Sequence, residues 1–183
     1  IAQEFHQTRK APWEEFNHFL GYTKHGGTVL DLGCGNGRLY EFLKLKKARY
    51  LGIDHNSHLL DKARESYPEA KFQLADMTDA ELPNSGFDNA FCIAAFHHIP
   101  GKKMRKQVVK SIHRSLKSDG ILILTVWNLF QFKYLKEMFK AILFCILHLG
   151  LKTAWNDLMI KWGNFPVKRY YHAFLPKELL KYF

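Results

Sequence analysis

Hydrophobic residues in the first 127 positions gather in short runs, with segments of helical spacing between them. The runs have the length of strands, and most are bounded by glycine, proline or charged residues. Predicted strands occupy residues 28–32, 49–54, 71–74, 87–93 and 121–127. Strands and helices that alternate at this spacing predict an α/β fold, with a mostly parallel, twisted sheet and helices on both faces.

Between the predicted strands, apolar residues recur every three or four positions, which places them on one face of a helix. Helices are predicted within residues 1–20, divided at Pro12, and at 38–43 and 58–67. A longer amphipathic helix is predicted from the spacing of Met104, Val108, Ile112 and Leu116. Its other face is cationic, with Lys102, Lys103, Arg105, Lys106 and Lys110. Such a face is either a solvated surface or a contact for RNA phosphates.

After Trp127 the pattern is less regular. Apolar residues of helical spacing predict a helical insertion over residues 129–165. Its apolar core is far shorter than the ~20 residues that span a bilayer. Three interpretations are open: a cap over an active site, a dimer or partner surface, or an interfacial membrane helix through 129–150. A short strand over 167–174 and a helix from Pro176 are expected to follow.

Length and composition favour one domain over residues 1–183, with an N-terminal helical segment at 1–24 and ends that we expect to be incomplete. The net charge of +10 favours a polyanionic partner, RNA first, or an anionic membrane, although a soluble enzyme can also be basic. Three distant cysteines without a C-x-x-C pair indicate neither disulfides nor a metal site. We therefore expect a reducing, cytoplasmic location.

Three glycines at alternate positions, Gly33, Gly35 and Gly37, follow the first predicted strand. Glycine can adopt positive φ, so the backbone of such a loop can approach a ligand closely. The spacing differs from the G-x-G-x-x-G of dinucleotide enzymes, and Asp31 precedes the loop. A carboxylate there would repel a pyrophosphate and attract a cationic amino acid. This argument favours S-adenosylmethionine (SAM) over NAD as the ligand.

Further polar residues follow the next predicted strands, at the edge where open α/β sheets bind ligands. Asp54 lies about twenty residues after the loop, where a ribose-binding carboxylate is expected, unless it caps the next helix. Asp76 follows the third strand, where it either binds the ligand or caps the following turn. His97 and His98 follow the fourth strand. Their role there is either to line a pocket or to take part in catalysis.

The segment D-L-G-C-G-N-G, residues 31–37, resembles motif I of the class I SAM-dependent methyltransferases, which have a Rossmann-like fold. In that family the acid after the third strand commonly meets the adenine amino group. The backbone N–H of the next residue meets the ring, so these roles fall to Asp76 and Met77. The resemblance implies SAM as cofactor and no metal. The expected cofactor-binding residues are Asp31, Gly33, Cys34, Gly35, Gly37, Asp54, His55, Asp76, Met77 and Ala94.

Two flanking segments carry a narrower resemblance. I-A-x-E-F-x-x-T-R-x-x-x-W at residues 1–13 and R-Y-Y-H-x-F at 169–174 resemble the eukaryotic tRNA wobble-uridine carboxymethyl methyltransferases. That family includes the methyltransferase domain fused to an AlkB-like oxygenase. The resemblance implies that SAM esterifies the carboxylate of 5-carboxymethyluridine in the anticodon loop of tRNA. The eukaryotic enzymes use a small zinc-containing activator subunit, so a partner of that kind is considered.

A carboxylate acceptor, with a pKa near ~4, is already an anionic nucleophile at neutral pH and needs no general base. The expected catalytic residues are Arg9 and Arg169, which would grip the acceptor, and His97. Aromatic residues such as Tyr171 would stack bases or pack in the core. Two alternatives stay open: a small-molecule or lipid-type O-methyltransferase, and a non-catalytic RNA-binding scaffold on a methyltransferase fold.

Overall fold

The computed structural model describes residues 15–79, 81–84, 86–148, 154–161 and 167–183. The chain divides into two compact units. The first contains residues 1–93 and 110–124, and the second contains residues 94–109 and 125–183. The expected helices before Glu15, and with them Arg9, lie outside the described residues.

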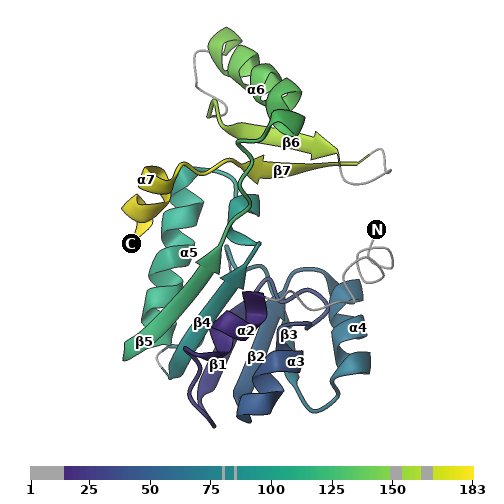
Figure 1. Ribbon diagram of the computed structural model, residues 1–183, viewed down its shortest axis with the longest axis vertical. Coiled ribbons are helices and arrows are strands. Elements are labelled where there is room, and N and C mark those ends of the chain that lie inside the picture. The colour runs from purple at the N-terminus through teal and green to yellow at the C-terminus, as the bar shows by residue number, and fades with distance from the viewer. Residues whose placement is uncertain (1–14, 80, 85, 149–153, 162–166) are drawn as a thin grey trace. The chain divides into compact units, whose positions relative to one another are not determined.

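The first unit is built on a five-stranded sheet with the order β3-β2-β1-β4-β5 (Figure 1). The strands are β1 (Thr28–Leu32), β2 (Arg49–Asp54), β3 (Lys71–Leu74), β4 (Phe87–Ile93) and β5 (Leu116–Thr125). Strand β1 pairs in parallel with both β2 and β4, and β2 pairs in parallel with β3. The predicted α/β fold is confirmed.

Strand β1 lies in the middle of this sheet, and its apolar side chains are fully buried. Central parallel strands are covered on both faces, which explains the nearly continuous apolar run. The buried cluster beside β1 includes Phe16, Leu43 and Phe91. The edge of the Phe16 ring packs against Phe42, with ring centroids 5.3 Å apart. The core therefore holds β1 rigidly at the start of the glycine loop.

The helices of this unit are short: α2 (Glu15–Leu20) precedes β1, and α3 (Tyr40–Leu43), the 3-10 turn η1 (Lys44–Lys46) and α4 (Ser57–Ser66) connect the strands that follow. Helix α4 begins after Asn56, whose side-chain oxygen accepts a hydrogen bond from the Leu59 backbone N–H at 3.2 Å. An asparagine at this position satisfies a donor that the helix itself leaves open. The cap of α4 is thus Asn56, and Asp54 is left for another role.

Strand β5 begins at Leu116, five residues before the predicted strand, and it ends at Thr125. The polar segment 117–120, which precedes the predicted strand, belongs to β5. Two ion pairs hold this part: Lys117 Nζ lies 2.8 Å from Asp88 Oδ1, and Lys24 Nζ lies 3.1 Å from Asp119 Oδ2. The start of β5 is fixed by ion pairs with residues of other elements, and hydrophobic periodicity along the chain does not show such contacts.

The second unit contains η2 (Phe96–His98), η3 (Phe132–Tyr134), α6 (Leu135–Leu147), β6 (Asp157–Lys161), β7 (Lys168–His172), α7 (Pro176–Leu179) and η4 (Leu180–Tyr182). Helix α5 (Lys102–Ser115) is divided between the units, and its Val108 and Ile112 are buried as predicted. Strands β6 and β7 pair antiparallel. The predicted helical insertion is therefore wrong for β6, which alternates between a buried Leu158 and an exposed Met159.

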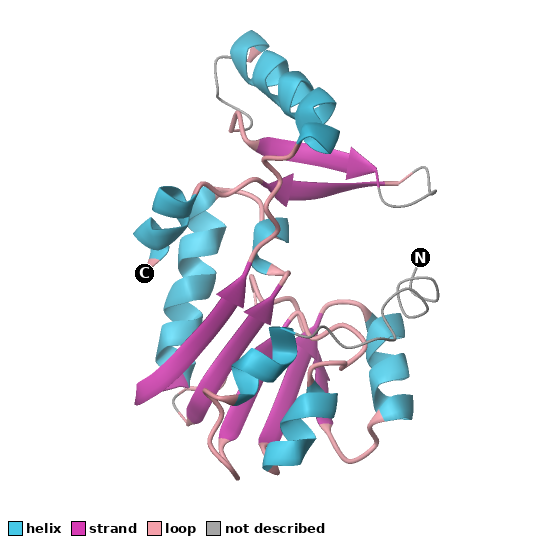
Figure 2. Ribbon diagram, in the orientation of Figure 1, coloured by secondary structure: helices cyan, strands magenta, loops and turns pink. Residues whose placement is uncertain are grey.

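Helix α6 lies against β6 (Figure 2), and Met138 and Ala141 pack on the small core that contains Leu158 and Tyr171. The rest of its surface carries exposed apolar residues, and the preceding Phe132 is 92% exposed. In the described part of the chain, no helix is long and apolar enough to cross a membrane. The three interpretations of this segment stay predictions.

Candidate functional site

The glycine loop after β1 has the backbone that its sequence predicts. Gly33, Gly35 and Gly37 have φ angles of 74°, 57° and 77°, in the left-handed region that favours glycine. The backbone N–H groups of Gly33 and Cys34 both donate to the Ile53 carbonyl, at 2.8 and 3.1 Å. A Cβ on Gly37 would lie 2.9 Å from the Phe72 ring. The loop is fixed to the end of β2 and has no room for larger residues at Gly37.

Asp54, the last residue of β2, joins this loop to the start of the next helix. One carboxylate oxygen accepts a hydrogen bond from the Gly35 N–H at 2.8 Å, and the other accepts one from the Asn56 N–H at 2.8 Å. Each oxygen can accept a second bond, so the carboxylate can also receive two ribose hydroxyls. The exposed ring of His55 lies 3.7 Å from the same carboxylate. This arrangement suits a nucleoside.

Asp31 differs from the freely ionised acid that the sequence argument assumed. Its side chain is 2% exposed, and it accepts a hydrogen bond from the Tyr50 hydroxyl at 2.7 Å. Burial raises the pKa of Asp31 to about 7, although the Tyr50 hydrogen bond opposes the rise. Near neutral pH this carboxyl is therefore divided between its two protonation states. A cationic ligand would favour the ionised state.

The contacts and burial of two other predicted residues of the first unit, Asp76 and Cys34, indicate what each can do. Partial burial would raise the pKa of Asp76, but the backbone and hydroxyl donors of Thr78 hold it below its ordinary value. Both bonds, at 2.8 and 2.7 Å, use the same oxygen, and Met77 beside it is half-buried. The carboxylate thus caps a turn, and its other oxygen can still meet a ligand. Burial raises the pKa of the Cys34 thiol, which leaves Cys34 unreactive as a nucleophile.

Asp31, the glycine loop, Asp54 and Asp76 lie at the carboxyl ends of β1, β2 and β3. The sheet therefore brings together predicted residues that are as far as 45 positions apart in sequence. The loop N–H groups of Gly33, Cys34 and Gly35 already donate within the protein, and three carboxyl groups gather at this edge, which fits a cationic nucleoside such as SAM better than a pyrophosphate. In the described residues, no cluster of His, Cys, Asp and Glu could hold a metal ion.

Ala94, which follows β4, has an unusual backbone. Its φ of 52° is in the left-handed region, which is uncommon for a residue with a Cβ. Its N–H donates to the backbone and the hydroxyl oxygens of Thr125, at 3.1 and 3.0 Å. Strain of this kind often marks functional positions. The expected cofactor contact of Ala94 stays a prediction.

The two histidines that follow pack inside the second unit. His97 is fully buried, its ring stacks on Tyr171, and its Nδ1 accepts a hydrogen bond from the Trp127 N–H at 3.3 Å. His98 lies 2.9 Å from the Tyr170 carbonyl. These contacts favour a packing role for His97 over the expected catalytic one. Arg169 is half-buried on β7, opposite Ile160, and its catalytic role also stays a prediction.

The sequence patterns placed Arg105 on an exposed face and did not predict the polar network that contains it. Arg105 was grouped with the solvated lysines of α5, yet it is 3% exposed. It donates to the Tyr182 hydroxyl and to the Ile99 carbonyl, at 2.9 and 3.0 Å. The same network contains a buried His172 between two carboxylates. The only signal in the sequence was the R-Y-Y-H-x-F motif.

Comparison with known proteins finds a matching protein family, curated relatives and solved structures. Residues 30–124, just over half of the chain, match a protein family described as a methyltransferase domain. The chain is 33% identical over 144 residues to the tRNA (carboxymethyluridine(34)-5-O)-methyltransferase alkbh8 of Xenopus tropicalis, and 32% identical over 132 residues to the corresponding Saccharomyces cerevisiae enzyme. A solved SAM-dependent methyltransferase from Methanosarcina mazei has the same fold, with a TM-score of 0.76 and 22% identity, over 90% of this chain and 81% of that one.

These matches confirm the resemblances that were read from the glycine loop and from the flanking motifs. The two curated relatives match 75% and 72% of this chain. The chain, however, spans only 22% of the Xenopus tropicalis protein and 46% of the yeast protein. The similarity therefore covers a shared domain and not the whole length of either relative.

Proposed function

Because the chain belongs to the methyltransferase domain family, we propose that it methylates the carboxymethyl group of a modified wobble uridine in tRNA. S-adenosylmethionine is the cofactor of this domain. The observation that carries the proposal is the bond between the left-handed glycine loop and Asp54, since together they would form a nucleoside site. The choice of acceptor is supported by the two relatives, whose names specify carboxymethyluridine in tRNA.

In this proposal Asp31, Asp54, Asp76 and the glycine loop of the first unit each have a separate role in holding the cofactor. Asp54 would accept hydrogen bonds from the ribose hydroxyls with the acceptor positions that Gly35 and Asn56 leave open. Asp76 would receive the adenine amino group on the oxygen that Thr78 does not use. Asp31 would balance the ammonium of the amino-acid end. The loop backbone allows this close approach because its glycines have no side chains.

When bound, SAM supplies a methyl group on a sulfonium, which becomes a neutral thioether after transfer. A carboxylate oxygen of the acceptor forms the new C–O bond, and the C–S electron pair stays on sulfur. No proton moves, because the acceptor carboxylate is already ionised at neutral pH. The chain therefore needs to align the acceptor with the methyl group at ~3 Å and to exclude water, and it needs no general base.

Cations hold the acceptor in this proposal. Arg169, and Arg9 outside the described residues, would grip the carboxylate or a neighbouring phosphate. The exposed Lys102, Lys103 and Lys106 on α5 would contact the tRNA backbone. His97 would have a packing role in the second unit, because its ring is fully buried against Tyr171. A small activator subunit, which the sequence resemblance implies, would be a further partner in this proposal.

The proposal is tested with methyl-labelled SAM and total tRNA. The tRNA comes from cells that lack the enzyme that methylates carboxymethyluridine. We expect label in tRNA that mild base releases, because an ester hydrolyses where N-methyl and C-methyl groups do not. Binding of tRNA should weaken as salt rises. Asp54→Asn should abolish labelling by weakening SAM binding, and Asp79→Asn, at an exposed acid near Asp76, serves as the control. Base-stable label, or label in lipid only, would refute the proposed acceptor.

A further inference from the structure

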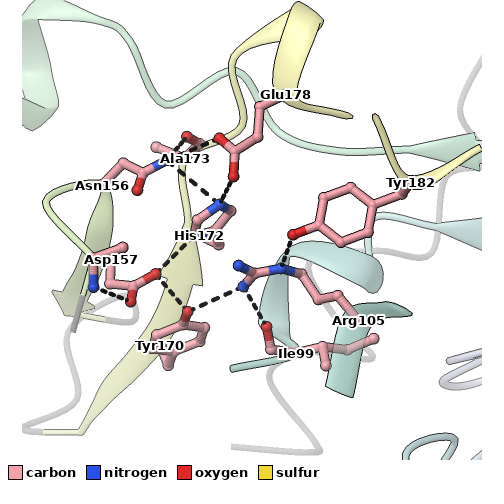
Figure 3. A network of polar contacts seen from close by, with 10 residues as sticks. Ile99, Arg105, Asn156, Asp157, Tyr170, His172, Ala173, Glu178 and Tyr182 are labelled. Carbon is pink, nitrogen blue, oxygen red and sulfur yellow. Dashed lines mark hydrogen bonds and ion pairs between the residues drawn. The ribbon is translucent and has the colours of Figure 1, made fainter. Parts of the chain in front are cut away.

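The second unit contains a buried polar network that the proposed chemistry does not use (Figure 3). Its members come from α5, β6, β7, α7 and η4. We call it the β7 network, and its residues are Arg105, Asn156, Asp157, Tyr170, His172, Glu178 and Tyr182. All of them belong to one unit, so the geometry is internal to that unit.

His172 is the centre of this network. Its side chain is 1% exposed, with Nδ1 2.6 Å from Asp157 Oδ1 and Nε2 2.7 Å from Glu178 Oε1 (Figure 3). An ionised carboxylate accepts hydrogen bonds and does not donate them, so both ring nitrogens must donate. A ring with two N–H groups is the positively charged imidazolium. Two short, charge-assisted hydrogen bonds therefore fix this ring in position and in protonation state.

The remaining members satisfy and neutralise the two carboxylates. The Tyr170 hydroxyl donates to Asp157 Oδ1 at 2.6 Å, and the Asn156 amide donates to Glu178 Oε2 at 3.1 Å. Arg105 adds a second positive charge, with Nη1 3.4 Å from the Tyr170 hydroxyl. Two cations thus offset two anions. Removing the charge of His172 would leave Asp157, whose side chain is 11% exposed, without this counter-ion, which is unfavourable.

The register of the β6–β7 pair relates the β7 network to Arg169. Asp157 faces His172 directly across the two strands, whereas Arg169 lies opposite Ile160. Side chains alternate along a strand, so His172 and Tyr170 lie on one face and Arg169 and Tyr171 on the other. Fixing the network face of β7 therefore also fixes the direction of Arg169. A slip of one residue would exchange the two faces.

We propose that His172, as an imidazolium between Asp157 and Glu178, is a positioning residue that holds β7, and with it Arg169, in a fixed register within the second unit. This inference rests on the proposed function, in which Arg169 grips the acceptor carboxylate. His172 itself touches no substrate. Its loss should therefore affect the use of tRNA and leave the binding of SAM unchanged, because the glycine loop, Asp31, Asp54 and Asp76 all lie in the first unit.

The kinetic test compares His172→Gln with wild type and with His148→Asn, a histidine at the end of α6 outside the network. A displaced positioning group costs up to ~10²-fold in rate. For His172→Gln we expect kcat/KM for tRNA to fall at least about tenfold, with the dissociation constant of SAM within about twofold of wild type. Glu178→Gln, which keeps the shape of the carboxyl group, should give a smaller loss in the same direction.

A spectroscopic test is independent of catalysis. Long-range ¹H–¹⁵N NMR on histidine-labelled protein should show both nitrogens of His172 protonated at pH 7, and Glu178→Gln should weaken this signature. A neutral His172 ring overturns the inference, as does a folded His172→Gln or Glu178→Gln variant with wild-type kcat/KM for tRNA. If His172→Gln does not fold, Glu178→Gln decides. If the wild-type protein does not methylate tRNA while His172 is doubly protonated, the proposed function fails and the orienting role falls with it.

Discussion

Replacing Asp31 by asparagine should stabilise the fold and weaken the cofactor site at the same time. Asparagine has nearly the shape of aspartate and can still accept the Tyr50 hydrogen bond, but it carries no charge. In the folded protein, burial raises the pKa of Asp31 from 3.8 to about 7. The folded state therefore binds a proton more tightly than the unfolded state does. Ionising this buried group costs free energy that the variant avoids.

The magnitude follows from proton linkage. Between pH ~4 and ~7 the folded wild-type protein holds a proton that the unfolded chain has lost, so its stability falls as pH rises, by ~1.4 kcal/mol per pH unit. Below this window both states are protonated, and above it both are ionised. The stability gain of Asp31→Asn should therefore grow by about 3 kcal/mol from pH 5 to pH 8. Cofactor affinity should fall, by about tenfold at pH 8, because the ammonium loses its counter-charge.

Urea unfolding of the cofactor-free protein at pH 5, 6, 7 and 8 measures the first effect, and calorimetric titration with SAM measures the second. Asp79→Asn removes a charge from an exposed residue of the same unit and serves as the matched control. A stability difference between Asp31→Asn and wild type that does not change with pH would refute the assigned titration. Unchanged SAM affinity at pH 8 would show that Asp31 supports the loop without meeting the ligand.

Three further substitutions test the fold around the site. Gly52→Ala should destabilise by about 1–3 kcal/mol in thermal unfolding, because a Cβ would lie 2.9 Å from Cys34 Sγ and from the Phe72 and Tyr50 rings. Ala94→Gly should stabilise by about 1 kcal/mol by relieving the left-handed φ, and a loss would show that the Cβ packs. Asp88→Asn should destabilise by about 1–3 kcal/mol at pH 7, since Lys117 and Thr28 hold the pKa of Asp88 well below its ordinary value. This wild-type stability is present above pH ~4 and should be lost as pH falls further.

The fold of the first unit could be predicted because its signals are local. Each central strand is a buried apolar run, and the glycine loop needs left-handed backbone at three positions that only glycine adopts readily. The place of Asp54 also follows from local order, because a parallel sheet brings the end of β2 beside the loop after β1. The capping of α4 was harder to assign, since Asp54 and Asn56 are both good caps and only the structure distinguishes them.

The second unit resisted prediction because its determinants are distant in sequence. Arg105 has the spacing of a surface cation, but its partners Tyr170 and Tyr182 are 65 and 77 residues away, and contacts of this kind make burial of a guanidinium tolerable. Strand β6 is five residues long, so its alternation is too brief to outweigh the helical pattern before it. The contacts of His172 depend in the same way on Asp157, 15 residues before it, and Glu178, six residues after it. A pattern along the chain can indicate which residues are buried, but pairing between buried charges is a property of the folded unit alone.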